Sequence, residues 1–200
     1  MNNYFLFSAK NTLSGVASAF APEGTKLAHE LISELENINE LYFDFELIKL
    51  TISKDGIVKS NDLTSLKDIW LDYLPNSLAW ALFSEKLKKT FEKNLTGKEG
   101  INWLTAKING NGEQRIYYIP RFNKMLDVLD TEKTKFNKVT GDVIIPHFSL
   151  VKVQNYSVFP QPASYGLWKI TSGLYISEVL KKAIQKEKLS GVDFEKTRVS

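Results

Sequence analysis

The clearest pattern of apolar and polar positions lies near the C-terminal end of the chain, between Tyr175 and Val199. Ser177 stands where a helix N-cap is expected, because its hydroxyl can accept a free N–H of the first turn. Gly191 is the expected stop, since glycine enters the left-handed region without steric cost. Apolar residues after it predict a strand, so the unit is strand, helix, strand. The apolar stripe of the helix repeats at helical spacing: Val179, Leu180, Ala183 and Ile184.

A similar unit occurs earlier, where residues 82–89 resemble residues 175–182. Ser84 takes the place of Ser177, and Leu87 and Phe91 begin an apolar stripe at four-residue steps. Two explanations stay open. The units are an internal duplication, or they converged because a serine followed by a glutamate starts many helices well.

Shorter patterns predict the remaining elements. Asp55-Gly56 between two apolar runs predicts a hairpin, and Asn109-Gly110-Asn111-Gly112 predicts a second turn. Residues 159–166 are expected to be a loop, because two prolines and a glycine cannot serve a ladder of strand hydrogen bonds. A helix capped by Thr25 is expected to bury one face, and strands are expected at residues 4–7, 79–83, 101–108, 114–119, 143–145, 150–153 and 167–170.

These elements predict an α+β fold, with a mixed, largely antiparallel sheet, hairpins and two strand-helix-strand units. The chain has 200 residues, which is enough to bury a sizeable core. We expect a single domain over residues 1–200, or two intimate lobes over residues 1–112 and 113–200. The sequence leaves the oligomeric state open.

Composition narrows the functional classes. The hydrophobic content of 43% is typical of a globular chain, and the net charge of +3 favours neither a nucleic-acid partner nor a membrane surface. Because the chain has no cysteine, disulfides and thiolate chemistry are excluded. The first ten residues have no basic leader, and no apolar run reaches the roughly 20 residues of a membrane helix, so we expect a cytoplasmic protein.

Residues with catalytic or metal-binding potential are few. His29 and His147 have no carboxylates at ligand spacing, so we expect neither a metal nor any other cofactor. Asp127 and Asp130 form the best carboxylate pair, because an i, i+3 spacing would place them on one helix face. The pair is compatible with general acid–base catalysis or cation binding. It is equally compatible with two turns in which each aspartate accepts hydrogen bonds from the backbone.

Two features suit contact with another protein. An acidic run from Glu30 to Glu46 starts on the outer side of the first predicted helix and contains no lysine or arginine, and it is either a solvated face or a patch offered to a basic partner. Aromatic residues in proline-bearing stretches are the ones most expected to be exposed, and exposed aromatics anchor many interfaces. The resulting candidates for partner binding are Glu30, Glu34, Glu40, Trp70, Tyr73, Phe159 and Tyr165.

Short motifs in the C-terminal half resemble a known family. They are Tyr117-Tyr118-Ile119, the stretch Leu126-Asp127-Val128-Leu129-Asp130-Thr131-Glu132-Lys133-Thr134, Leu167-Trp168-Lys169-Ile170, the helix start Ile176-Ser177-Glu178, and Leu189-Ser190-Gly191-Val192-Asp193-Phe194. Their order is similar to that in immunity proteins of bacterial polymorphic toxin systems, a group first catalogued as a domain of unknown function. The similarity spans Tyr117 to Val199. Thr134 stands where the family often has serine, and Asn76 to Leu87 match only loosely.

The resemblance implies a non-enzymatic inhibitor that binds a cognate toxin in the cytoplasm. It carries over no catalytic residue to this sequence. Two alternatives stay open, a small hydrolase that uses Asp127 and Asp130, and a structural interaction module that has no toxin.

Overall fold

The computed structural model describes residues 3–10, 16–54, 56–164, 166–197 and 199. Its first sheet joins the two ends of the chain. Strand β1 (Tyr4–Ala9) lies between β10 (Leu174–Ser177) and β11 (Val192–Thr197), and β9 (Val158–Pro160) pairs with β10 at the edge. Every pairing is antiparallel. The strand predicted at residues 4–7 is therefore confirmed, and it lies at the centre of this sheet.

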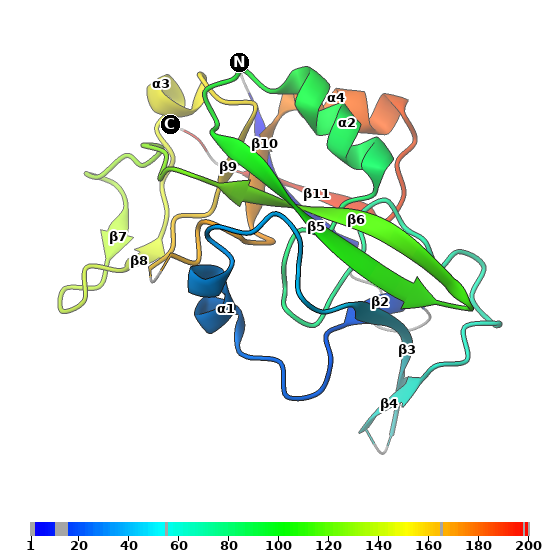
Figure 1. Ribbon diagram of the computed structural model, residues 1–200. Helices are drawn as coiled ribbons and strands as arrows, with labels where there is room; N and C mark the ends of the chain where they lie inside the picture. The colour runs from blue at the N-terminus through cyan, green and yellow to red at the C-terminus, as the bar shows by residue number, and fades with distance from the viewer. Residues whose placement is uncertain (1–2, 11–15, 55, 165, 198, 200) are drawn as a thin grey trace.

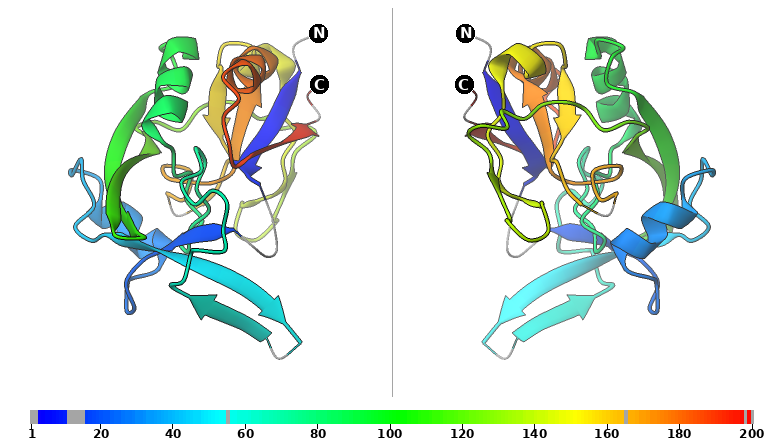
Figure 2. Two further views of the ribbon diagram at one scale, coloured as in Figure 1. Left: turned by 90° about the vertical axis from the view of Figure 1, so that its right-hand side faces the viewer. Right: turned by 90° about the vertical axis from the view of Figure 1, so that its left-hand side faces the viewer.

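The second sheet is built mainly from the first half of the chain. Its order is β2 (Ala17–Phe20), β3 (Phe45–Ser53), β5 (Ile101–Gly110) and β6 (Glu113–Phe122), and β4 (Gly56–Ser60) also pairs with β3. Among the described strands of this sheet, β3 and β5 run parallel and the other neighbouring pairs are antiparallel. Beyond the sheet, β3 and β4 project as a hairpin, which Figure 2 shows extending away from the rest of the molecule.

Both predicted hairpins form. Residue Gly56 opens β4 opposite the end of β3. Between β5 and β6, Asn111 and Gly112 have φ of 52° and 76°, as the turns that suit the twist of antiparallel strands require. Strand β6 continues through Pro120, which pairs with Trp103.

The serine-capped helices also form as predicted. Helix α2 (Glu85–Asn94) begins where Ser84 Oγ accepts the N–H of Leu87 at 3.2 Å. Helix α4 (Glu178–Lys186) begins where Ser177 Oγ accepts the N–H of Leu180 at 3.3 Å. The two helices lie side by side over the sheets (Figure 1).

The ends of two helices differ from the prediction. Helix α1 (Ala28–Glu34) is capped at Leu27 rather than Thr25, because the Glu30 carboxylate accepts the Leu27 N–H at 2.9 Å. Helix α4 ends before Lys188, which itself has φ of 53°, and Gly191 instead shapes the turn into β11.

Two hydrophobic clusters form the core, and residues 79–83 run between them. Trp80 and Leu82 belong to one cluster, whereas Ala81 and Phe83 belong to the other. The segment is extended and buried on both sides, which explains its continuous apolar run. It makes only isolated bridges, such as the paired hydrogen bonds of 2.8 Å between Phe83 and Tyr118, rather than the predicted strand.

Two further expectations were wrong, and a third was correct only in part. Residues Leu150–Val153 form the short helix α3 instead of a strand, and residues 167–170 form a turn. The expected loop at residues 159–166 begins inside strand β9, because Pro160 ends an edge strand and needs no further ladder.

A third, two-stranded sheet stands apart from the others. Strand β7 (Lys135–Phe136) pairs with β8 (Val143–Ile145), and the resulting hairpin lies at the side of the molecule (Figure 1). The α+β class is confirmed. The division into one domain or two lobes stays a prediction, although β5 and β6 pair across residues 112 and 113 and each cluster draws on both halves.

Candidate interaction surface

The carboxylate pair suggested by the sequence is not assembled as a pair. Asp127 and Asp130 lie in an irregular segment rather than on a helix face. Asp127 binds Lys152 Nζ at 2.8 Å, whereas Asp130 binds Lys133 Nζ at 3.2 Å and accepts the Glu132 N–H. Each carboxylate therefore has its own lysine, as expected of aspartates that hold turns.

Neither histidine completes a catalytic or metal-binding group. His29 is exposed on α1, and the backbone of His147 bonds to Asp130 and Thr134. Within the described part of the chain, no three histidine, aspartate or glutamate side chains converge as metal ligands would. Among the same residues, no helix is both long and apolar enough to cross a membrane.

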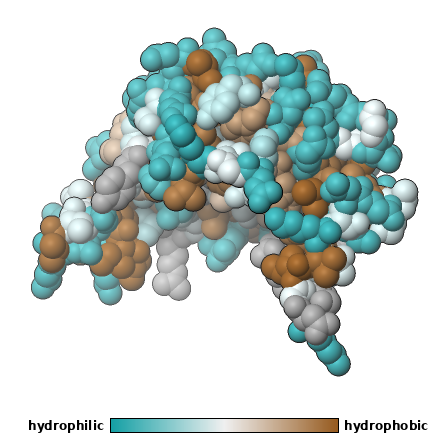
Figure 3. Space-filling model, turned by 60° about the horizontal axis from the view of Figure 1, so that its bottom comes forward, coloured by the Kyte–Doolittle hydropathy of each residue, from teal (hydrophilic) through white to brown (hydrophobic). Residues whose placement is uncertain are grey.

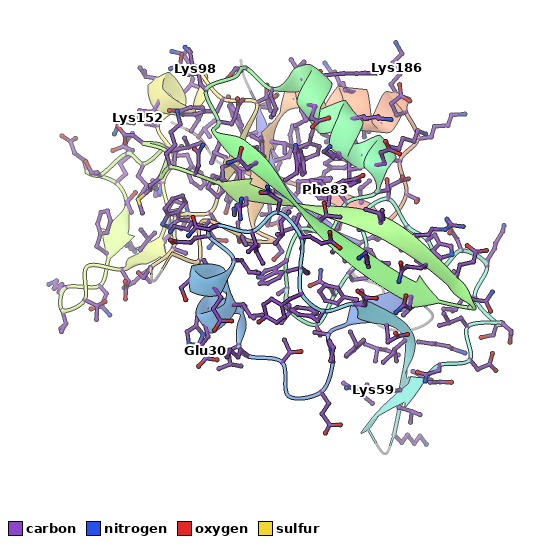
Figure 4. All side chains as sticks on the ribbon, viewed as in Figure 1. Glu30, Lys59, Phe83, Lys98, Lys152 and Lys186 are labelled. Atoms are coloured by element: carbon purple, nitrogen blue, oxygen red, sulfur yellow. The ribbon has the colours of Figure 1, made fainter. Side chains whose placement is uncertain are left out.

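The three glutamates proposed for partner binding already have partners within the chain. Glu30 caps its own helix, as described above. Glu34 accepts hydrogen bonds from Lys26 and from the Tyr42 hydroxyl, and the bond from Lys26 lowers the pKa of the Glu34 carboxyl. Glu40 forms an ion pair with Lys107. Figure 4 shows Glu30 at the outer side of α1, where solvent screens such pairs.

The expectation that the loop aromatics are exposed was wrong for two of them. Tyr73 is 1% exposed and its ring packs against Phe7 and Phe83. Phe159 is fully buried because it lies in β9, where its ring stacks on Tyr175 with centroids 5.3 Å apart. Pro160 is the last residue of strand β9, so the proline did not indicate an exposed loop at Phe159.

Trp70 is partly exposed and remains available at the surface. The guanidinium of Arg115 lies over its ring, 4.6 Å from the centroid, and its other contacts include Tyr117. Tyr165 lies outside the described residues. A role of these residues in partner binding stays a prediction.

Two buried polar groups that sequence reasoning missed hold the first sheet to its neighbours. Glu99 is 1% exposed and accepts N–H groups from Thr96 and Ser157. The Tyr4 hydroxyl donates to the carbonyl of Val153 at 2.6 Å, and burial, followed by the nearby Glu99 charge, raises the pKa of Tyr4 to about 12. Both groups are satisfied within the fold, so we assign them to stability rather than to chemistry.

Several exposed apolar side chains lie on the β7–β8 hairpin. We call these residues, with Met125 beside them, the β7–β8 surface. Figure 3 shows a protrusion with brown patches at this side of the molecule. The exposed fractions are 63% for Met125, 38% for Phe136, 93% for Val139, 61% for Ile144 and 46% for Ile145.

A hollow of about 350 Å³ opens at the base of this surface. Its walls are mostly apolar and come from three separate parts of the chain, among them Met125, Val128, Leu129, Phe136, Pro160 and Trp168. The hollow also touches Asp127, which Lys152 holds. No sequence pattern identified it, because its walls meet only in the folded chain.

A second protrusion carries a smaller apolar group. On the β3–β4 hairpin, Ile57 and Val58 are 67% and 54% exposed, and Figure 3 shows this hairpin at the opposite side of the same face. Lys59 lies over the ring of Phe20, 4.5 Å from its centroid. This hairpin adjoins a different hollow, of about 600 Å³, whose wall includes Ile57 together with polar residues such as Lys10 and Ser18.

Comparison with known families gives a match over most of the chain. The model of the immunity protein family Imm11 matches residues 55–199. The matched region includes β4 to β11, and with them both serine-capped helices and the β7–β8 surface. No curated protein matches the chain.

Proposed function

Because the chain belongs to the Imm11 immunity protein family, we propose that it binds a cognate bacterial toxin in the cytoplasm and neutralises it by protein–protein contact. The observation that carries the proposal is the match over residues 55–199, which is almost three quarters of the chain. On this proposal the protein catalyses no reaction. It acts by occupying a surface that the toxin needs.

The geometry of the polar residues supports contact rather than catalysis. An acid–base pair needs two groups that face one substrate, but Asp127 and Asp130 are each held by a different lysine. The exposed apolar side chains are instead the kind that interfaces bury. A stable inhibitory interface would cover roughly 1,200–2,000 Å² in total.

Co-expression with the product of the adjacent toxin gene tests the proposal. We expect the intact chain to restore growth of cells that produce the toxin, and the purified pair to elute together in size-exclusion chromatography. Failure of both would overturn the proposal.

The double variant Asp127→Asn/Asp130→Asn separates inhibition by binding from hydrolysis. An inhibitor that acts by contact retains protection in this variant, because Asp130 holds a local turn and Lys133, and Asp127 holds Lys152. A hydrolase that uses the pair would lose protection while its circular dichroism spectrum stayed native.

A further inference from the structure

We propose that helices α2 and α4, with the turns that follow them, attract and contact an acidic surface of the toxin. We call residues 85–98 and 178–188 the helix layer. This inference rests on the proposed function and names the side of the protein that meets the toxin. Charge distinguishes this side, whereas hollows open on three separate parts of the described surface and do not.

The positive charge of the chain is concentrated in the helix layer. Its 25 residues include nine lysines and four glutamates, a net charge of +5, whereas the whole chain carries +3 and the remaining residues therefore carry −2. The two segments are far apart in the sequence, but Lys86 Nζ donates to the Glu187 carbonyl at 2.8 Å, and the helices lie side by side (Figure 1). Folding therefore adds the fields of two segments that are each net positive.

Ion pairs inside the helix layer leave this excess in place. Three of its glutamates each pair with a lysine one turn away: Glu85 with Lys89, Glu92 with Lys88, and Glu178 with Lys182. Lys93, Lys186 and Lys188 are exposed, and none of them forms an ion pair with another of the described residues. These three lysines can therefore meet carboxylates of a partner without first breaking an ion pair of the fold.

The strand beneath α4 does not cancel the excess. On β11, Phe194 faces α4, because Lys181 Nζ lies 5.3 Å from the centroid of its ring. Side chains alternate between the two faces of a sheet along a strand, so Asp193 and Glu195 are on the face away from α4. Lys196 shares the face of Phe194 and adds to the positive charge on this side.

Two carboxylates inside the protein border the helix layer. Glu99 is 1% exposed and accepts the N–H of Thr96. The partly buried Asp72 accepts the hydroxyl of Ser84, the N-cap of α2. When both carboxylates and Lys196 are counted with the helix layer, this side still has a net charge of +4. A partner surface that carries carboxylates is therefore attracted to it.

The residues among the lysines indicate a protein partner rather than a nucleic acid. A nucleic-acid backbone is negative throughout, and exposed bases commonly stack on aromatic side chains. The helix layer instead has glutamates between its lysines, and its single aromatic residue, Phe91, is fully buried. Val179, which is 68% exposed on α4, adds an apolar contact of the kind that protein interfaces bury.

Other faces of the described residues lack a comparable positive excess. Residues 28–46, which include α1, carry a net charge of −6. On the β7–β8 hairpin, the carboxylates Glu132 and Asp142 balance Lys135 and Lys138. Figure 4 shows Glu30 and Lys186 towards opposite sides of the molecule. The protein is therefore polarised, and its field would orient an acidic toxin towards the helix layer as the two approach.

Lysine labelling of the unmodified protein locates the contact without any substitution. Acetylation by an N-hydroxysuccinimide ester is followed by mass spectrometry, with and without the toxin. We expect the toxin to slow the labelling of Lys93, Lys186 and Lys188 at least threefold. Exposed lysines elsewhere are the internal control and should change less than 1.5-fold: Lys67, Lys135 and Lys138. Protection of the control lysines alone would overturn the helix layer as the docking face.

Two triple variants of equal charge separate the local field from the total charge. Lys93→Gln/Lys186→Gln/Lys188→Gln should lower the association rate with toxin at least fivefold at low salt, with less effect at high salt. The control is Lys67→Gln/Lys135→Gln/Lys138→Gln, which should change the rate less than twofold. Both variants lower the net charge of the chain from +3 to 0. Circular dichroism checks that each variant retains its helices.

The outcomes distinguish the docking face from the proposed function. Equal association rates for the two triple variants would overturn the docking face and leave the proposed function standing. A DNA duplex of roughly 20 base pairs at about 150 mM salt tests the other class of partner. Binding of this duplex that only the helix-layer variant abolishes, with unchanged toxin association, would also overturn the docking face. Absence of toxin binding by the unmodified protein would instead overturn the proposed function, and the docking face with it.

Discussion

Asp72 and Ser190 lie 118 positions apart in the chain and form reciprocal hydrogen bonds in the fold. The Asp72 carboxylate accepts the N–H of Ser190 at 2.8 Å and its hydroxyl at 3.0 Å, and the Asp72 N–H donates to Ser190 Oγ at 3.0 Å. The same carboxylate accepts the hydroxyl of Ser84, the N-cap of α2, at 2.6 Å. The Asp72 side chain therefore joins Ser84, at the start of α2, to Ser190, which lies between α4 and β11.

Replacement of Asp72 tests how much this junction stabilises the fold. Asp72→Ala removes a charged acceptor, so the N–H of Ser190 and the hydroxyls of Ser190 and Ser84 each lose a hydrogen bond. We therefore expect the free energy of unfolding to fall by about 2–3 kcal/mol. Urea denaturation measures the loss. Asp127→Ala is the control, because the Asp127 side chain is 76% exposed and pairs only with Lys152. It should cost less than about 1 kcal/mol, and equal losses in the two variants would contradict the junction.

The turn after α4 gives a second prediction. Gly191 has φ of 73°, and a Cβ added there would lie 2.4 Å from the Tyr73 carbonyl oxygen. Gly97 has φ of 82° but nothing within 4 Å of the same position. Gly97→Ala should therefore cost only the backbone strain, about 1 kcal/mol, whereas Gly191→Ala should cost at least twice as much because the backbone of Tyr73 must move. Chemical denaturation of both variants compares the costs directly.

Glu99 gives a third prediction, since its two oxygens accept backbone N–H groups from Thr96 and Ser157 inside the protein. Glu99→Ala leaves both donors unsatisfied, and we expect a loss of about 2–4 kcal/mol. Glu99→Gln keeps one acceptor oxygen and should recover part of that stability. Identical melting temperatures for the alanine variant and the unmodified protein would show that the contact adds little.

Local signals in the sequence were sufficient for the elements that depend on local chemistry. Ser84 and Ser177 cap helices because the N–H groups that they accept are three residues away. Asn111 and Gly112 form a turn because their own backbone preferences allow positive φ. Such interactions involve neighbouring residues and are visible in a single sequence.

The features that the sequence did not predict depend on contacts between residues far apart in the chain. Phe159 is buried because β9 pairs with β10, and no local pattern shows that a short segment before two prolines has a partner strand. The acidic run that starts on α1 left two interpretations open, a solvated face or a patch for a basic partner, and Lys107, which pairs with Glu40 in this run, comes from β5. The hollow at the β7–β8 surface likewise requires walls from residues 125–136, 160–162 and 168 to meet.

The pH dependence of stability follows from Tyr4. The pKa of Tyr4 is about 12 in the fold and about 10 in an unfolded chain. The contribution of Tyr4 to the free energy of unfolding is therefore complete below pH 10 and declines as pH rises towards 12. The decline amounts to roughly 2–3 kcal/mol at most, at about 1.4 kcal/mol per pH unit.

Tyr4→Phe is the control for that decline. The variant should be less stable than the unmodified protein at pH 8, because it lacks the hydrogen bond to Val153. It should lose stability less steeply between pH 10 and 12. Parallel slopes in the two proteins, measured by urea denaturation at each pH, would assign the alkaline loss to other tyrosines such as Tyr73 and Tyr117, whose pKa values burial also raises.

The acidic segment around α1 provides the last prediction, on toxin association. Complementary fields mainly raise association rates, but Lys26 and Lys107 lie against Glu34 and Glu40 and reduce the net field of that face. The triple variant Glu30→Gln/Glu34→Gln/Glu40→Gln should therefore change the association rate with toxin less than threefold at low salt. Surface plasmon resonance at two salt concentrations measures the effect. A fall of tenfold or more that disappears at high salt would instead establish that these glutamates steer a basic toxin, because only exposed, unscreened charge has that salt dependence.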